Sequence, residues 1–258
     1  MASADVRPGV PGTILTFAWR TLLKMRHAPQ QLFDAVAFPI MVTLVFTYLF
    51  GGALAGSTSR YLTYLLPGVV VLTVVMISMS TGVALNTDIA TGVFDRFRSL
   101  PIWRPAMIIG ALLADVVRYL TASVIALGLG MAMGFRPAGG LAGALLGLLL
   151  LQVFAFSLAW VWTTLGLIAS KPQTVMSVSG IALFPLLFCS DIFVEPRTMP
   201  GWLATLVDVN PISHAVAAER ALMYGTATTG QVGTALLTCA LLVAVFGSAT
   251  GYLFARQR

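Results

Sequence analysis

The chain has 258 residues, of which 58% are hydrophobic and only 9% are charged, with a formal net charge of +6; its mean hydropathy is +0.92. Because a soluble domain carries about 25% charged residues, this composition excludes a soluble enzyme. The length suits roughly six bilayer-spanning helices of about 20 residues each. The two cysteines, Cys189 and Cys239, lie in apolar runs and predict neither a disulfide framework nor a metal cluster.

The first predicted element is a short amphipathic helix over residues 13–27. Leu15, Ala18 and Trp19 lie on one side of it, and Arg20 and Lys24 lie on another. Such a helix is typical of the headgroup layer of a membrane, although packing on the protein's own spans is an alternative. We see no cleaved signal peptide. Residues 1–31 are therefore expected to be a cytoplasmic or interfacial segment, and residues 32–258 the membrane domain.

Six apolar segments follow, and each is long enough to cross a bilayer as a helix. They are Leu32–Phe50, Tyr61–Leu85, Pro105–Phe135, Leu141–Ala169, Thr174–Phe193 and Val232–Phe254. The predicted fold class is an all-α polytopic membrane protein.

The basic residues predict the orientation of these spans. With the N-terminus inside, the cytoplasmic stretches are 1–31, 86–104, 170–173 and 255–258, and they hold ten of the fifteen Lys and Arg residues. Cytoplasmic loops of membrane proteins are enriched in these residues. We therefore expect a multi-pass protein of the cell membrane with both termini in the cytoplasm. The positive charge is an orientation signal and gives no independent support for nucleic-acid binding.

The loop between the second and third spans, residues 87–101, has a helical pattern of its own. Ile89, Val93, Phe94, Phe97 and Leu100 recur at helical spacing, Thr87 or Asp88 can cap the start, and Pro101 ends it. Aromatic and arginine side chains are favoured anchors at protein interfaces. The pattern indicates a cytoplasmic helix that docks a soluble partner, or a loop whose apolar side rests on lipid.

The third span contains a charged pair, Asp115 and Arg118, near its expected inner end. Ionisable residues inside a membrane are usually paired or functional. At a spacing of three residues the two charges can satisfy each other. We weigh this against snorkelling to the inner surface and against contact with a substrate.

The segment Asp191–Gly225 lies on the expected outer side and is too charged to span. Trp202, Leu203, Leu206 and Val207 predict one short amphipathic helix. Asn210 and Pro211 then begin a second helix as N-cap and first helical residue, with Glu219 and Arg220 on its polar side. Two such helices indicate either a re-entrant hairpin or an external loop on the headgroups.

These segments resemble the type-2 permeases of ABC transporters, most closely the daunorubicin-resistance subgroup of multidrug exporters. The resemblance is carried by GVFDRFRSLP at Gly92–Pro101, the span with Asp115 and Arg118, the GFRP turn at Gly134–Pro137, and NPISHAVAAERALMYG at Asn210–Gly225. It covers nearly the whole chain. The residues around Asp95–Pro101 are its most specific part, whereas apolar spans alone carry no weight.

The resemblance implies two permease copies, identical or related, working with two copies of a separate ATPase. It implies six spans, an N-terminal interfacial helix, a cytoplasmic coupling helix and outer re-entrant helices. The implied ATPase-coupling residues are Asp88, Phe94, Asp95, Arg96, Phe97, Arg98, Leu100 and Pro101, and the implied outer-gate residues are Asn210, Pro211, Glu219 and Arg220. Substrates of the subgroup are hydrophobic drugs, antibiotics or lipids.

The residues themselves predict no catalytic, cofactor or metal site in this chain. A phosphate-binding loop ends in Gly-Lys-Ser/Thr, but the two lysines are followed by Met25 and Pro172. ATP and its magnesium ion are therefore expected on a partner chain. The alternatives are an ion-coupled secondary transporter, which would show inverted repeats and mid-membrane charges, and a permease for polysaccharide or lipid-linked glycan export.

Overall fold

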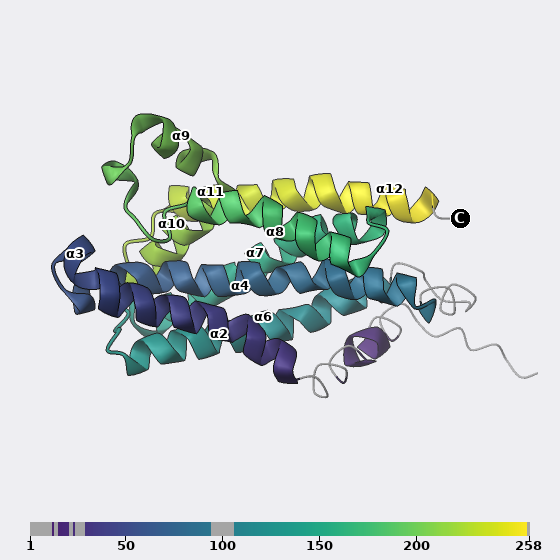
Figure 1. Ribbon diagram of the computed structural model, residues 1–258, viewed down its shortest axis with the longest axis horizontal. Coiled ribbons are helices and arrows are strands. Elements are labelled where there is room, and N and C mark those ends of the chain that lie inside the picture. Colours follow the sequence, from purple (N-terminus) through teal and green to yellow (C-terminus); the bar gives the residue numbers. More distant parts are fainter. Residues whose placement is uncertain (1–11, 13–14, 21–22, 24–28, 94–105, 257–258) are drawn as a thin grey trace, which may run out of the picture.

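The computed structural model describes residues 12, 15–20, 23, 29–93 and 106–256, and every regular element within them is helical. The long helices lie side by side along the long axis of the molecule (Figure 1). They are α2 (Pro29–Val45), α4 (Thr58–Ala90), α6 (Ala106–Ala132), α7 (Gly140–Ile168), α8 (Pro172–Phe188) and α11 (Thr229–Leu242). The short ones are α3 (Gly51–Ala55), α9 (Gly201–Val209), α10 (Pro211–Tyr224) and α12 (Ser248–Arg256).

Two π-helical turns keep interrupted helices continuous. Phe46–Phe50 joins α2 to α3, and Val243–Gly247 joins α11 to α12. In the second case the Thr164 hydroxyl on α7 donates to the carbonyl of Phe246 at 3.1 Å, which supplies a partner for a carbonyl in the widened turn. A single 3₁₀ turn, Pro196–Thr198, precedes α9.

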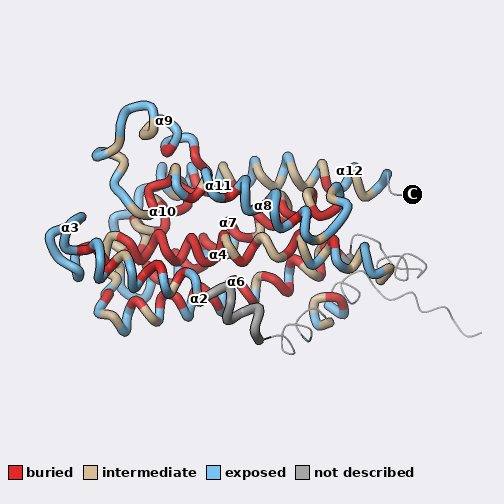
Figure 2. Tube along the Cα trace, viewed as in Figure 1, coloured by how far each residue is buried: buried red, intermediate tan, exposed pale blue. Residues whose placement is uncertain are grey.

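Helix α4 forms the centre of the bundle. It contacts α2, α6, α7, α8 and α10, and most of its residues from Tyr61 to Ser78 are buried. Figure 2 shows the buried residues concentrated along α4 and α7, while α9 and the flank of α11 and α12 are exposed. The uncharged run Val69–Val75, which is β-branched except for Leu72, fits this central position because it can pack on every side.

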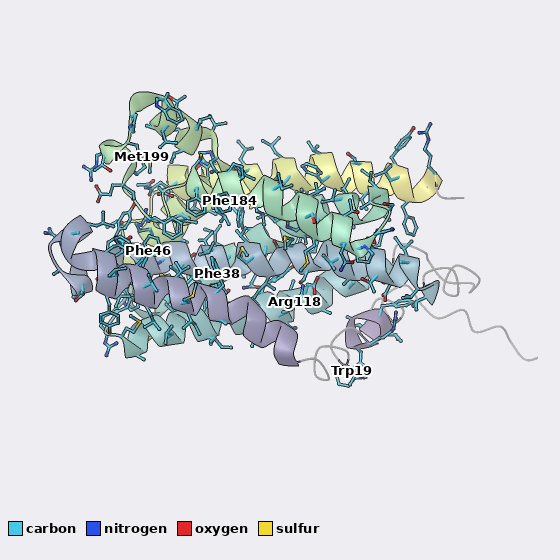
Figure 3. The ribbon with its side chains drawn as sticks, viewed as in Figure 1. Trp19, Phe38, Phe46, Arg118, Phe184 and Met199 are labelled. Carbon is cyan, nitrogen blue, oxygen red and sulfur yellow. The ribbon has the colours of Figure 1, made fainter. Side chains whose placement is uncertain are left out.

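The two ends of the bundle differ. The end with α3, α9 and α10 is called the hairpin end, and the end with residues 15–20 and the C-terminus is called the terminal end (Figure 1). Residues 15–20 are helical, with Leu15 and Trp19 exposed and Phe17 buried. Trp19 points away from the bundle (Figure 3), as expected for a helix that presents an apolar face to its surroundings.

Among the described residues, five helices are long and apolar enough to cross a membrane, so the chain is a multi-pass membrane protein. These segments are Ala37–Ala55, Thr58–Ala90, Ile108–Ala132, Gly140–Ile168 and Thr229–Arg256. They correspond to the first, second, third, fourth and sixth predicted spans. The first, second and sixth run further than the apolar pattern indicated, because helical geometry continues through flanking polar residues such as Thr58 and Asp88.

The fifth predicted span is shorter than expected. Thr174–Phe193 was predicted, but α8 ends at Phe188 after 17 residues, which corresponds to about 25 Å. The Asn210 amide donates to the carbonyls of Leu186 and Cys189, at 2.6 and 2.8 Å, and so caps the end of α8. Beyond Cys189 the chain leaves the helix, because Tyr61 and Tyr64 of α4 bind the carbonyls of Phe193 and Asp191.

The predicted start of the loop helix is also wrong. Thr87 and Asp88 do not begin a new helix but lie in the last turns of α4, which ends at Ala90. Gly92, with φ of +69°, turns the chain after this point in a conformation that favours glycine. The remainder of the predicted helix, residues 94–101, lies outside the described residues.

Candidate functional site

Of the predicted ATPase-coupling residues, the structure describes only Asp88. Its carboxylate lies 3.8 Å from the Arg20 guanidinium, and both side chains are about one-third exposed. This ion pair connects the N-terminal helical segment to the end of α4. Phe94, Asp95, Arg96, Phe97, Arg98, Leu100 and Pro101 lie outside the described residues.

Close to Asp88, near the end of α4, the backbones of α4 and α7 are in direct contact. A Cβ atom added to Gly166 would lie 2.6 Å from the carbonyl oxygen of Gly82, and one added to Gly82 would collide with the carbonyl of Trp162. The Asn86 amide donates to the carbonyls of Gly166 and Ala169, at 2.9 and 2.7 Å. The end of α7 is therefore fixed to the end of α4, immediately before the chain enters the predicted coupling segment.

A buried polar cluster connects α4 and α6 in the middle part of the bundle. Arg118 lies 2.9 Å from Asp115, and the Thr81 hydroxyl donates to the other oxygen of Asp115. The Tyr119 hydroxyl is 2.9 Å from the Thr81 hydroxyl. Figure 3 places Arg118 on α6 away from both ends of the bundle.

The positions of Asp115 and Arg118 distinguish mutual pairing from snorkelling to the membrane surface. Asp115 lies nine residues after the start of α6, about 14 Å along the helix, and both side chains are buried. The charges therefore do not snorkel to a surface. Asp115 and Arg118 pair with each other on α6, and Thr81 of α4 donates to Asp115, so the cluster has the geometry of a structural link between α4 and α6.

The predicted N-terminus of α10 has the expected capping geometry. The Asn210 side chain accepts a hydrogen bond from the amide of Ile212 at 2.9 Å, and Pro211 is the first residue of α10. Because the same side chain also caps α8, Asn210 fixes α10 against α8. Gly225, with φ of +71°, ends the helix.

Arg220 forms a second charged cluster at the hairpin end. It lies 2.9 Å from Asp191, donates to the Asp191 carbonyl at 3.0 Å, and stacks 4.1 Å above the Tyr64 ring centre. Burial raises the pKa of Asp191, while the Arg220 guanidinium acts in the opposite direction. The cluster joins α10, the loop after α8 and α4.

The sequence predicts Glu219 and Arg220 on the polar side of α10, but this prediction is wrong for Glu219. It is 0% exposed, and neither carboxylate oxygen has a hydrogen-bond partner. Burial raises its pKa from 4.5 to about 8. The correction has a physical cause: Glu219 is in register with Ile212, Ala215 and Met223, the apolar residues that face α4 and α7.

In the described part of the chain, His, Cys, Asp and Glu side chains nowhere gather in a group of three that could hold a metal ion. What the structure does provide is a set of interhelical connections, one at each end of α7 and one between α4 and α6. Such connections can carry movement between the two ends of a bundle.

Comparison with known proteins identifies the family. Residues 13–224 match the model of the ABC-2 type transporter family. The chain belongs to this family.

Three relatives of this permease are named for drug resistance. It is 51% identical to the daunorubicin resistance ABC transporter permease protein DrrB1 of Streptomyces coeruleorubidus, over 98% of this chain and 90% of that protein. It is 24% identical to the probable doxorubicin resistance permease DrrC of Mycobacterium tuberculosis, over 92% and 88% of the two chains. It is 27% identical to DrrB of the same species, over 76% and 68%. These comparisons do not favour the ion-coupled or glycan-export alternatives.

Sequence reasoning missed several residues that organise the permease. Asp191 and Tyr64 complete the Arg220 cluster, and Asn86 fixes α7 to α4. A polar residue near the end of an apolar span, as Asn86 is, was an available signal. No signal within the sequence pairs Tyr64 with Asp191, because 127 residues separate them.

Proposed function

We propose that this chain is the permease subunit of an ATP-driven exporter that moves a hydrophobic drug, antibiotic or lipid-like compound out of the cytoplasm or the inner leaflet. The observation that carries the proposal is 51% identity over 98% of the chain to a permease named for daunorubicin resistance. Because the sequence contains no phosphate-binding loop, the proposal includes a separate ATPase subunit that binds ATP and magnesium.

In this proposal α8 also crosses the membrane, as the fifth of six spans in chain order. Its 17 residues are short for a hydrocarbon layer of about 30 Å, and local thinning of the bilayer accommodates such a span at modest cost. Six spans bring both termini to the same side, and the excess of basic residues there supports a cytoplasmic location. The hairpin end of the bundle is then the outer end.

The proposed coupling site is the segment from Asp88 to Pro101. Phe94, Phe97 and Leu100 would occupy an apolar groove of the ATPase, and Arg96 or Arg98 would pair with acidic groups at its edge. The proposal is supported by the position of this segment directly after the α4–α7 contact made by Gly82, Asn86 and Gly166. A force on the segment would reach both helices together.

The proposed route to the outer gate follows α7. This helix contacts α4 at the terminal end and α10 at the hairpin end, where Asn210, Pro211, Glu219 and Arg220 lie. Movement of α4 and α7 would thus change the position of α10. A second permease copy, identical or related, would complete the translocation path with this one.

The test is co-purification of the permease with its ATPase from cells that express both. We expect the double variant Phe97→Asp, Arg98→Glu to lose at least about 90% of the bound ATPase, because one change places a charge in an apolar contact and the other reverses a charge. The control is Arg197→Glu, a charge reversal at an exposed position of the hairpin end, which should leave co-purification unchanged.

The same variants are then assayed for export. Inverted membrane vesicles that contain the ATPase should accumulate fluorescent daunorubicin when ATP is added, and the double variant should not. ATP-independent accumulation driven by a proton gradient alone would contradict the proposal, as would full ATPase binding by the double variant.

A further inference from the structure

Glu219 differs from the other buried acids of the permease. Asp115, Asp191 and Glu219 are the buried acidic residues among those described. The first two each lie 2.9 Å from an arginine, whereas both oxygens of Glu219 lack any partner. An ionised carboxylate buried without a partner is strongly disfavoured, and such a group takes up a proton instead.

The carboxyl group of Glu219 lies against a glycine of α7. A Cβ atom added to Gly147 would lie 2.6 and 2.8 Å from its two oxygens, so any larger residue at this position would have to displace the carboxyl group. Two further contacts between the α7 side and α10 lie close to this carboxyl group. The Gly139 amide donates to the Met223 carbonyl at 2.8 Å, and a Cβ on Gly143 would collide with the Leu222 carbonyl. The backbones of α7 and α10 are thus in close contact around Glu219.

The elements around Glu219 offer no cation to this carboxyl group. Helix α7 has no ionisable side chain, and α11 has only the thiol of Cys239. On α4, Arg60 is exposed, Tyr61 and Tyr64 bind loop carbonyls, and Asp88 pairs with Arg20 at the other end. The only ionisable residue of α9 is Asp208, which is exposed.

On α10 itself the ionisable groups have other partners. Arg220 pairs with Asp191, the electrostatic effect of His214 acts on the same carboxylate, and the Tyr224 hydroxyl donates to the Thr63 carbonyl at 2.6 Å. Within the described residues, a proton is therefore the means by which the buried Glu219 becomes neutral.

We propose that Glu219 is a proton-binding site that controls the contact between α10 and α7: the protonated side chain holds α10 against Gly147, and loss of the proton releases it. The proton-binding site is inferred from the burial and contacts of Glu219. Only the role of α10 as an outer gate rests on the proposed function. Separation of the helices would expose the carboxyl group to water, where it gives up its proton. Renewed contact would take one up from the same side, so the cycle needs no proton gradient.

The direction of the pH dependence follows from linkage. The buried state has a pKa of about 8 and the exposed state about 4.5, so between these values the closed contact binds more protons than the open one. Closure is then favoured at low pH and weakens as pH rises from about 4.5 to 8, by up to about tenfold per pH unit. Above pH 8 the dependence ends because both states are ionised.

The experiment measures access to the contact in the full-length permease, purified into lipid vesicles. Cys189 and Cys239 are first replaced, and Ala218→Cys, at a fully buried position of α10, is labelled with a maleimide between pH 5.5 and 8.5. The same measurement is made with Glu219→Gln, a neutral side chain of the same shape. The ratio of the two labelling rates removes the intrinsic pH dependence of the thiol.

We expect this ratio to rise at least about tenfold from pH 5.5 to 8.5. Asp208→Asn, which removes an exposed acid of α9, should leave it unchanged. A ratio that stays constant overturns the proposal.

If the glutamine variant does not fold, a second measurement is infrared titration of the unmodified protein. It must show a protonated carboxyl group that persists to about pH 8 and is not seen in Glu219→Met. If the unmodified protein shows no such carboxyl group, the proposal is also overturned. Since no ATPase or drug is present, loss of transport alone leaves this result intact.

Discussion

At the scale of single residues, the buried charges determine where the permease tolerates substitution. Asp115 and Arg118 pair with each other at 2.9 Å. The Thr81 hydroxyl donates to the second carboxylate oxygen of Asp115, and the Tyr119 hydroxyl lies 2.9 Å from the Thr81 hydroxyl. Removing one member of such a buried pair leaves an uncompensated charge, which is more costly than replacing both.

We therefore expect Arg118→Ala to destabilise the permease by about 3–5 kcal/mol. The double variant Asp115→Asn, Arg118→Met should lose less than Arg118→Ala alone. The measurement is the thermal unfolding midpoint of the purified protein in detergent.

The matched control for this pair is Arg197→Ala. Its ion pair with Glu195, at 3.2 Å, is exposed and is expected to contribute no more than about 0.5 kcal/mol. Equal losses for Arg118→Ala and Arg197→Ala would argue against a structural role for the buried pair.

At the scale of elements, glycines decide how closely the helices approach. Gly82 and Gly166 bring α4 and α7 into backbone contact at one end, and Gly139, Gly143 and Gly147 bring α7 and α10 together at the other. Small residues at such positions are the usual means by which membrane helices approach closely. Helix α7 is thus the element that connects the two ends of the molecule.

Gly82→Ala should separate α4 from α7, because the new methyl group collides with the carbonyl of Trp162. We expect a loss of about 1–3 kcal/mol of stability, together with weaker coupling of ATP hydrolysis to export. Gly180→Ala in α8 is the control, since nothing lies within 4 Å of that position; it should be neutral or slightly stabilising. A stable, fully coupled Gly82→Ala protein would exclude α4–α7 contact as the connecting element.

At the scale of the whole molecule, the proposed orientation makes the two ends chemically distinct to an impermeant reagent. Lys171, between α7 and α8, is exposed, as is Arg197 before α9, and the two lie at opposite ends of α8 in the chain. Each can carry a single cysteine once the two free thiols, Cys189 and Cys239, are replaced.

Intact cells should therefore label Arg197→Cys with an impermeant maleimide, whereas Lys171→Cys should react only after lysis. This outcome follows from the basic bias of the predicted cytoplasmic stretches. The reverse labelling pattern would mean that the permease has the opposite orientation, with the coupling segment on the side of the membrane away from the ATPase.

Most of the fold was predictable because a bilayer imposes long apolar helices on the sequence itself. The five candidate membrane spans of the described residues and the caps of α10 at Asn210, Pro211 and Gly225 follow from local composition and local hydrogen bonding. For the length of the fifth predicted span, residues distant in sequence were responsible for the difference. Asn210, Tyr61 and Tyr64 end α8 at Phe188 and hold the following loop, which no local pattern can indicate.

The sequence by itself thus determined that this protein crosses a membrane, and it carries the family motifs by which the permease was recognised. Only the tertiary structure decided which charges have partners: it paired Arg220 with Asp191 and left the adjacent Glu219 buried against Gly147 without one. The physical reason is that hydrophobicity acts along a segment, whereas the free energy of a buried charge depends on groups that only the folded chain brings together.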